Sequence, residues 1–301
     1  MTRKKQPPFV EVRVPATTTN LGPGFDTLGL ALDLWNTVRF TLEGSGVNLT
    51  IRGEGSGALP EGEENLIWQA FTRLYAEAGA APPSGVRITC KNGIHPGSGL
   101  GSSAAAVVSG LLGANALLGM RFPLQSVFSL AARLEGHPDN AAAALFGGLV
   151  IVGGEQVRRV AIPPWTVVYV LPAVRFSTRQ ARAALPAQVS LEAAAGSIGR
   201  ALLVVEALRS GDLPLLREAM QDVLHQPYRL PHLPGMEAAL EAARNLGGAA
   251  ALSGAGPGMV VFCRRGQSRA IAEAVQAAFR AAGVESRAWT LRDSAQGAIV
   301  A

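Results

Sequence analysis

The chain has 301 residues, which is enough for two modest domains or one large domain with a buried core. Hydrophobic residues make up 48% and charged residues 16%, so an intrinsically disordered chain is excluded. The formal net charge is +5, but the basic residues are scattered and aromatic residues make up only 6%, so we expect no nucleic-acid partner.

The first half of the chain predicts a mixture of strands and helices. Residues 9–15 alternate between apolar and polar side chains, as a half-buried strand does. Similar patterns, or apolar segments bounded by glycine, predict further strands over 37–42, 47–51, 85–92 and 147–154. Apolar residues at helical spacing predict helices over 65–78, 102–118 and 123–134. Asn65 is the predicted N-cap of the first helix.

The pattern restarts after Pro163-Pro164, which we take as a domain boundary. Beyond it we expect a strand over 165–172, two strands flanking the glycine loop 253–258, and a last strand over 284–291. Helices are predicted near 190–210, 212–225, 234–246 and 268–282. Strands and helices are mixed without strict alternation, which predicts an α+β fold in two lobes, residues 1–160 and 161–301.

Missing motifs exclude several common chemistries. The chain has no GxxxxGK[ST] phosphate loop, no GxSxG nucleophile motif and no HExxH zinc motif. Cys90 and Cys263 lie far apart without metal-binding spacing, which indicates a reducing compartment. The basic opening has no apolar segment behind it, and the uncharged segment 96–120 is rich in glycine, serine and alanine. We therefore expect no signal peptide, no membrane span and a cytoplasmic location.

The glycine loop at 96–105, with sequence PGSGLGSSAA, is the strongest local signal. Its glycines permit positive φ and close approach of a ligand, and the helix behind it directs free N–H groups into the loop. This pattern predicts a phosphate site, in which Ser102 or Ser103 caps the helix or contacts magnesium. The alternative is an ordinary strand-to-helix turn with a serine N-cap.

Three further clusters each have two interpretations. The loop 253–258 is either part of the site or a tight hairpin. The polar segment 135–140, EGHPDN, either serves a site or forms a surface turn with an Asx cap. The segment 15–26, with hydroxyls followed by Asn20 and Asp26, either binds a small ligand or is a solvated loop.

Together these clusters resemble the motifs of the GHMP small-molecule kinases, and more narrowly of the homoserine kinase family. The motifs PATTTNLGPGFDTLGLAL, GSGLGSSAA, EGHPDNAAAALFGG and LSGAGPG are similar to those of the family, and the resemblance runs from about Val12 to the end. It implies a two-lobed fold, with a ribosomal-S5-like amino-terminal lobe and a ferredoxin-like α/β sandwich as the carboxy-terminal lobe. It also implies a homodimer, ATP and Mg²⁺, and phosphorylation of the homoserine hydroxyl in threonine biosynthesis.

The resemblance assigns roles to individual residues. It implies catalytic roles for Asn140, Asp26 and Arg182. The substrate-binding positions are Asn20, Asp26, His137, Asn140, Thr178, Arg182 and Arg229. The ATP-binding positions are Asn65, Pro96, Gly97, Ser98, Gly99, Leu100, Gly101, Ser102, Ser103, Ala104, Gly254 and Gly256. The metal ligands are Ser102 or Ser103 and Glu135.

The chemistry of these residues suits a zwitterionic substrate. The guanidinium groups of Arg182 and Arg229 suit a carboxylate. Asn140 stands where mevalonate kinases place an Asp, and an amide cannot accept a proton as a general base. We therefore expect catalysis by orientation, magnesium and the helix dipole, with Asp26 and Asp139 as candidate proton acceptors. The alternatives are a GHMP kinase for another small alcohol, and a non-catalytic module that binds nucleotide or nucleic acid.

Overall fold

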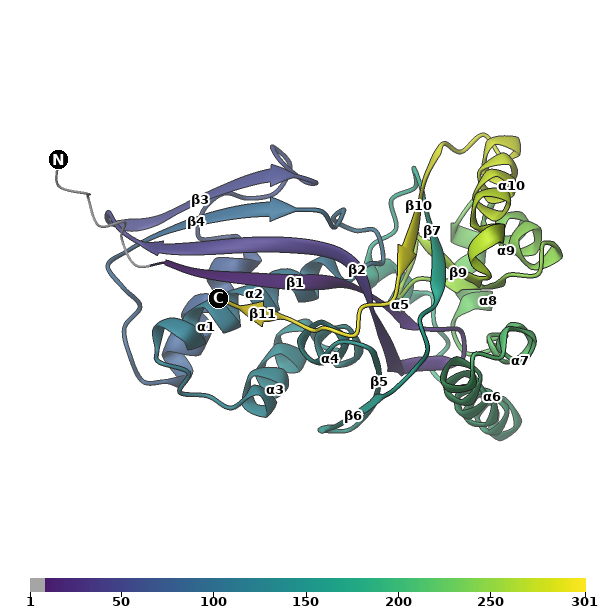
Figure 1. Cartoon of the computed structure of the whole chain (residues 1–301), viewed down its shortest axis with the longest axis horizontal. Coiled ribbons are helices and arrows are strands. Elements are labelled where there is room, and N and C mark those ends of the chain that lie inside the picture. The colour runs from purple at the N-terminus through teal and green to yellow at the C-terminus, as the bar shows by residue number, and fades with distance from the viewer. Residues whose placement is uncertain (1–8) are drawn as a thin grey trace.

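The computed structural model describes residues 9–301, which form two lobes, each built on a β-sheet (Figure 1). The opening segment, for which no signal peptide is expected, lies outside the described residues. In the first lobe the strand order is β11-β1-β2-β4-β3, and the β5–β6 hairpin pairs with β2. These strands are β1 (Phe9–Asn20), β2 (Gly24–Leu42), β3 (Gly46–Gly53), β4 (Gly85–Asn92), β5 (Leu149–Gly153), β6 (Gln156–Val160) and β11 (Ile299–Val300).

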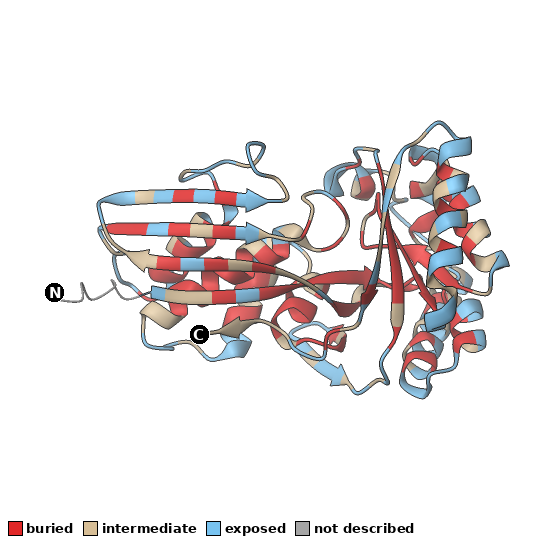
Figure 2. Ribbon diagram, turned by 45° about the horizontal axis from the view of Figure 1, so that its top comes forward, coloured by how far each residue is buried: buried red, intermediate tan, exposed pale blue. Residues whose placement is uncertain are grey.

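The long hairpin of β1 and β2 runs from the outer end of the first lobe to the second lobe. The two strands pair antiparallel from Phe9↔Thr41 to Asn20↔Gly24. The outer part of β1 alternates in burial, whereas residues 14–20 are all buried (Figure 2). This burial arises because the inner end of β1 lies between a helix and the second lobe: Thr17 bonds to Asn140, and Thr18 bonds to Ser253.

Four helices cover one face of the first sheet (Figure 1). They are α1 (Leu66–Glu77), α2 (Ser102–Leu117), α3 (Leu124–Glu135) and α4 (Asp139–Phe146). Helix α2 is buried on almost every side, which accounts for its apolar, small-residue sequence. A Cβ on Gly110 would lie 2.2 Å from the Ile67 carbonyl oxygen, so glycine at this position allows α1 and α2 to pack closely.

The second lobe has an antiparallel sheet with both faces covered. The strand order is β10-β7-β9-β8, formed by β7 (Thr166–Pro172), β8 (Ala249–Leu252), β9 (Met259–Cys263) and β10 (Ser286–Arg292). The outer face packs on α9 (Met236–Asn245) and α10 (Ser268–Ala281). The inner face packs on α6 (Leu191–Ser210), α7 (Leu213–Ala219) and the core of the first lobe. The short helices α5 (Thr178–Ala183) and α8 (Gln226–Arg229) face the first lobe.

The predicted α+β architecture in two lobes is confirmed, and most predicted elements are present. The division of the chain at residue 160 stays a proposal, since one apolar cluster spans both lobes and β11 returns to pair with β1. Among the helices of residues 9–301, none has both the length and the apolar character of a membrane span.

The structure corrects some of the predicted elements. The helix expected near 212–225 is present but shorter than predicted, because α7 ends at Ala219. The carboxylate of Asp222 instead accepts backbone N–H bonds from residues 224–226, which turns the chain into α8. Strand β1 is longer than the predicted 9–15, and β2 begins well before residue 37. Five of the helices and strands named above were not predicted: α4, α5, α8, β6 and β11.

Candidate active site

A cavity of about 370 Å³ lies where the two lobes meet. Its walls come from the β1–β2 turn, the loop before α2, the α3–α4 connection, the start of α5, the end of α8 and the β8–β9 loop. The predicted site residues that line it are Asn20, Asp26, Gly97, Ser98, Gly99, Gly101, Ser102, Ser103, Glu135, His137, Asn140, Thr178, Arg182, Arg229, Gly254 and Gly256. The four clusters singled out in the sequence therefore meet in one place.

The glycine loop presents an uncapped helix end to this cavity. Gly97, Gly99 and Gly101 have φ values of 67°, 79° and 68°, a region that favours glycine. Helix α2 begins at Ser102, and its N-cap residue is Gly101, which has no side chain to bond the first N–H groups. The alternative of a serine N-cap is therefore wrong. These N–H groups and the positive end of the helix dipole suit a phosphate.

Four predicted ATP-binding residues do not line the cavity. Leu100 and Ala104 point into the core, where they are 1% and 0% exposed. Pro96 precedes the loop outside the cavity wall. The Asn65 side chain accepts a bond from the Ile67 N–H at 2.9 Å and donates to the Pro60 carbonyl at 2.7 Å, so it caps α1 as predicted. Residues 66, 69 and 70 of α1 line the cavity instead.

Ser103 and Glu135 form a pair of oxygen donors beside the phosphate loop. The Ser103 hydroxyl donates to Glu135 Oε1 at 2.7 Å. Burial raises the pKa of the Glu135 carboxyl above its ordinary value, although the bond from Ser103 opposes this shift. No group of three or more acidic, histidine or cysteine side chains suited to a metal occurs within residues 9–301. Any cation here thus needs further oxygen ligands from a phosphate or water.

Asn140, in the first turn of α4, is held by two threonines of β1. Its Oδ1 accepts a bond from the Thr17 hydroxyl at 2.7 Å, and its Nδ2 donates to Thr19 Oγ1 at 3.3 Å. Both bonds join segments more than 120 residues apart. The Asp139 carboxylate, which can only accept, lies 3.5 Å from Nδ2 and sets which way the amide faces. The role of Thr17 and Thr19 was not predicted, since the sequence indicated only a run of hydroxyls.

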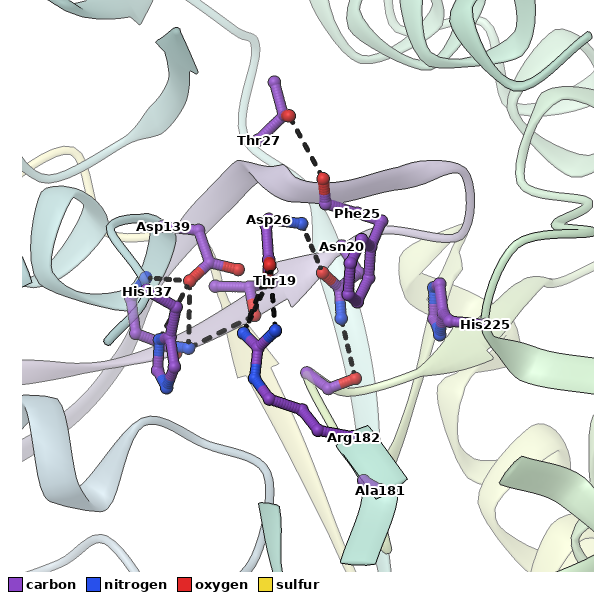
Figure 3. Close-up of polar contacts among 12 residues, drawn as sticks. Thr19, Asn20, Phe25, Asp26, Thr27, His137, Asp139, Ala181, Arg182 and His225 are labelled. Atoms are coloured by element: carbon purple, nitrogen blue, oxygen red, sulfur yellow. Dashed lines mark hydrogen bonds and ion pairs between the residues drawn. The ribbon is translucent and has the colours of Figure 1, made fainter. Parts of the chain in front are cut away.

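Asp139 and His137 lie close together beside Asn140. Asp139 is only 2% exposed, and its Oδ1 lies 3.3 Å from His137 Nδ1 and accepts the Asn140 N–H at 2.8 Å (Figure 3). The hydrogen-bonding carboxylate of Asp139 raises the pKa of His137 above its ordinary value. The alternative of a surface turn with an Asx cap is wrong, because Asp139 is buried, most of this segment is half-buried, and α4 begins without a side-chain cap bond.

An ion pair between Asp26 and Arg182 joins the lobes across the cavity (Figure 3). The guanidinium donates from Nη2 to Oδ1 at 2.9 Å and from Nη1 to Oδ2 at 3.1 Å. Asn20 supports this arrangement because its Oδ1 accepts the Asp26 N–H at 3.0 Å, while its Nδ2 donates to the Gly254 carbonyl at 2.8 Å. Asn20 and Asp26 have φ values of 68° and 54°, a backbone conformation that Asn and Asp tolerate better than most residues.

Arg229, at the end of α8, is a buried cation that no carboxylate of the described chain hydrogen-bonds. Its side chain is 2% exposed, and its bonds go to the carbonyls of Ala181 and Gly254 and to His225 Nδ1. Burial lowers its pKa to about 10, with nearby Arg182 contributing. Phe25 lies beside both guanidiniums, with Arg182 and Arg229 at 5.7 Å and 5.5 Å from the ring centre. Beside the Asp26–Arg182 pair, Arg229 thus offers a positive charge without a carboxylate partner among residues 9–301, which suits an anionic group.

These features are matched in known proteins. The family model for the GHMP kinases N terminal domain matches residues 65–148, and that for the GHMP kinases C terminal domain matches residues 204–281. The chain belongs to the GHMP kinase family, whose members transfer phosphate from ATP, and the two-lobed α+β fold expected from the resemblance is confirmed.

Within this family, the similar proteins are homoserine kinases. The chain is 45% identical to homoserine kinase from Moorella thermoacetica, over 96% of this chain and 99% of the relative. It is 39% identical to homoserine kinase from Synechococcus sp., over 94% and 93%. The crystal structure of homoserine kinase from Cytophaga hutchinsonii superposes with a TM-score of 0.87 at 29% identity, covering 100% of this chain and 99% of that one.

Proposed function

We propose that this chain is a homoserine kinase, which transfers the γ-phosphoryl group of ATP to the hydroxyl of L-homoserine in threonine biosynthesis. One observation carries the proposal: a single cavity joins an uncapped helix end to an acidic and two basic side chains from opposite lobes. Such a cavity suits a polyphosphate at one end and a zwitterion at the other. The similarity to homoserine kinases over nearly the whole chain supports the same substrate.

At the nucleotide end, the loop 97–101 and the first turn of α2 hold the phosphates of ATP. The first N–H groups of α2 have no side-chain cap, and residues 97–99 and 101–103 line the cavity. Gly254 and Gly256 line the opposite wall, and glycine there leaves room for the phosphates. The adenine then lies toward α1, where Leu66, Gln69 and Ala70 form part of the wall. Asn65 contributes to this part by starting α1 at the right place.

A magnesium ion fits beside the oxygen atoms of Glu135, Ser103 and Ser102. Mg²⁺ prefers oxygen ligands, and in nucleotide sites some of them come from the phosphates. When bound, the ion neutralises charge on the phosphates during transfer. The raised pKa of Glu135 is consistent with this use, since a buried carboxylate without its cation is costly.

At the amino-acid end, the substrate's two charges meet opposite charges on the protein. Arg229 and Arg182 bind the carboxylate, and Asp26 with Asn20 binds the ammonium and hydroxyl end. The Asp26–Arg182 ion pair gives each residue a partner in the absence of substrate. A bound zwitterion replaces this ion pair with two others, between its carboxylate and the arginines and between its ammonium and Asp26. An uncharged alcohol forms neither. His137 and Thr178 line the same part of the cavity.

The transfer step requires that the homoserine hydroxyl oxygen attack the γ-phosphorus in line as ADP leaves. The Asn140 amide, oriented by Thr17 and Thr19, hydrogen-bonds the attacking hydroxyl and aligns it. An amide does not take up the hydroxyl proton, so positioning and charge neutralisation supply most of the acceleration. The carboxylates Asp26 and Asp139 are the candidate acceptors for that proton.

ADP formation by the purified protein tests this proposal. We expect ADP to form when homoserine is supplied. We expect none when mevalonate, galactose or shikimate is supplied in its place. Arg229→Gln is expected to raise the KM for homoserine at least tenfold, because a charge-assisted bond is worth about 1.5–3 kcal/mol. Arg269→Gln is the matched control, since Arg269 is exposed on α10. ADP formation that does not depend on homoserine refutes the proposal.

The proposal extends to a cytoplasmic homodimer. Helix α6 and the segment before it expose large apolar side chains, which a monomer rarely leaves in contact with water. They are Val189, Leu191, Ile198, Leu202 and Leu203. A second copy of this chain, related by a twofold axis, covers this face with the same residues. Sedimentation is expected to show a dimer that Leu202→Glu dissociates and Leu246→Glu leaves intact; a monomeric parent protein refutes the dimer.

A further inference from the structure

A histidine behind the cavity is fully buried and was not singled out in the sequence. His225 immediately precedes α8, is 0% exposed and does not line the cavity. Its ring lies 5.4 Å from that of Phe25, on the side away from the Asp26–Arg182 pair (Figure 3). A buried polar ring of this kind costs free energy unless its nitrogens are bonded, so its two partners are informative.

The partners of His225 specify one tautomer. Nε2 lies 2.8 Å from the Gly22 carbonyl oxygen, which can only accept, so Nε2 carries the proton. Nδ1 lies 3.0 Å from Arg229 Nη1, and a guanidinium can only donate, so Nδ1 has a free lone pair. The ring is therefore neutral, and burial lowers its pKa in agreement with this. Asp222 Oδ2, 3.4 Å from Nε2, is the acidic group nearest to the ring.

The bonds of Arg229 show what this tautomer achieves. Nε donates to the Ala181 carbonyl at 3.2 Å, and Nη1 donates to Gly254 O at 3.3 Å as well as to His225. Within residues 9–301, Nη2 has no such partner, and Arg229 lines the cavity. Three bonds thus use the N–H groups of Nε and Nη1 and leave those of Nη2 for a ligand.

We propose that His225 is a positioning residue for the substrate: as its Nε2–H tautomer it ties Arg229 to the β1–β2 turn and directs the free Nη2 of the guanidinium toward the substrate carboxylate. The bond to Gly22 spans 203 residues and joins the two lobes, so the ring couples the position of Arg229 to the turn that carries Asp26. Asp222 holds His225 in place by accepting its backbone N–H at 2.9 Å. The inference rests on the proposed function, because it assigns a carboxylate to Arg229.

Two amide variants separate the two bonds. Asn at position 225 places an oxygen near the Nδ1 position and keeps an acceptor for Arg229, whereas Gln reaches toward Gly22 and leaves Arg229 without its acceptor. We expect His225→Gln to raise the KM for homoserine about tenfold, the equivalent of one bond to a charged group. His225→Asn is expected to raise it no more than about twofold, and kcat changes little in both variants.

A ligand that lacks the carboxylate provides the control. 3-Amino-1-propanol is homoserine without that group, so its inhibition constant against homoserine is expected to be the same in the parent protein and in His225→Gln. Denaturant unfolding of both variants measures their stability, which is expected to fall by a similar amount.

The outcomes are distinguishable. If His225→Gln and His225→Asn raise the KM for homoserine equally, His225 has a structural role only and the inference is wrong. The same holds if His225→Gln weakens the binding of homoserine and of 3-amino-1-propanol together. An active parent protein with that result still leaves the proposed function standing. If the parent protein shows no homoserine-dependent turnover, both the proposed function and the inference are refuted.

Discussion

The two glycines at positions 97 and 99 share a loop and a positive φ but differ in their surroundings, so replacing each by alanine separates the contributions of strain and packing. A Cβ on Gly99 would lie 2.3 Å from the Ser253 carbonyl oxygen and 3.1 Å from that of Gly256, and both are backbone atoms of the second lobe. A Cβ on Gly97 would have no protein atom within 4 Å. Both positions have left-handed backbone, with φ of 79° and 67°.

The expected losses of stability follow from these contacts. Each substitution carries about 1–2 kcal/mol of left-handed strain. Gly99→Ala also separates the two loops, which breaks the bond from Ser253 Oγ to the Gly99 carbonyl at 2.7 Å and weakens that from the Tyr169 hydroxyl to Ser98 at 2.6 Å. At about 1 kcal/mol for each buried bond, the total for Gly99→Ala is about 3–4 kcal/mol.

Urea unfolding and steady-state kinetics together measure the difference. Gly97→Ala is expected to lower the free energy of unfolding by about 1–2 kcal/mol but to raise the KM for ATP, because its methyl group enters the cavity. Gly99→Ala is expected to lose about twice that stability, and activity with it. Equal losses of unfolding free energy in the two variants would refute the contact between the phosphate loop and the β8–β9 loop.

Three further predictions concern single side chains. Since the pKa of Glu135 is raised, binding of Mg²⁺ with ADP should weaken as pH falls through that pKa, because the cation binds the carboxylate and not the carboxylic acid; calorimetry over a series of pH values measures this weakening, and Glu135→Gln should abolish it. Asn65→Ala should lower the free energy of unfolding by about 1 kcal/mol in urea, and Asn65→Asp, which keeps the cap oxygen, by less. Asn140→Asp should not raise kcat, and a large gain would show that a base was the missing element.

Local sequence patterns were sufficient for most elements and for the phosphate loop. The alternation at 9–15, the helical spacing at 65–78 and the spaced glycines at 97–101 depend on backbone preferences within a few residues, and the structure has strands, helix and loop there. Apolar spacing alone predicts a helix through 212–225. It does not predict that the Asp222 carboxylate accepts bonds from three N–H groups and turns the chain.

The sequence by itself determined which chemical groups are present and which segments carry them: a glycine loop before a helix, a polar segment at 135–140, and two arginines in the second half. Only the tertiary structure decided how they meet. The bond from Asn20 to Gly254 spans 234 residues, and that from Thr17 to Asn140 spans 123, so neither leaves a periodic trace in the sequence. The tautomer of His225 likewise depends on Gly22 and Arg229, because a ring nitrogen is a donor or an acceptor according to the partner that packing supplies.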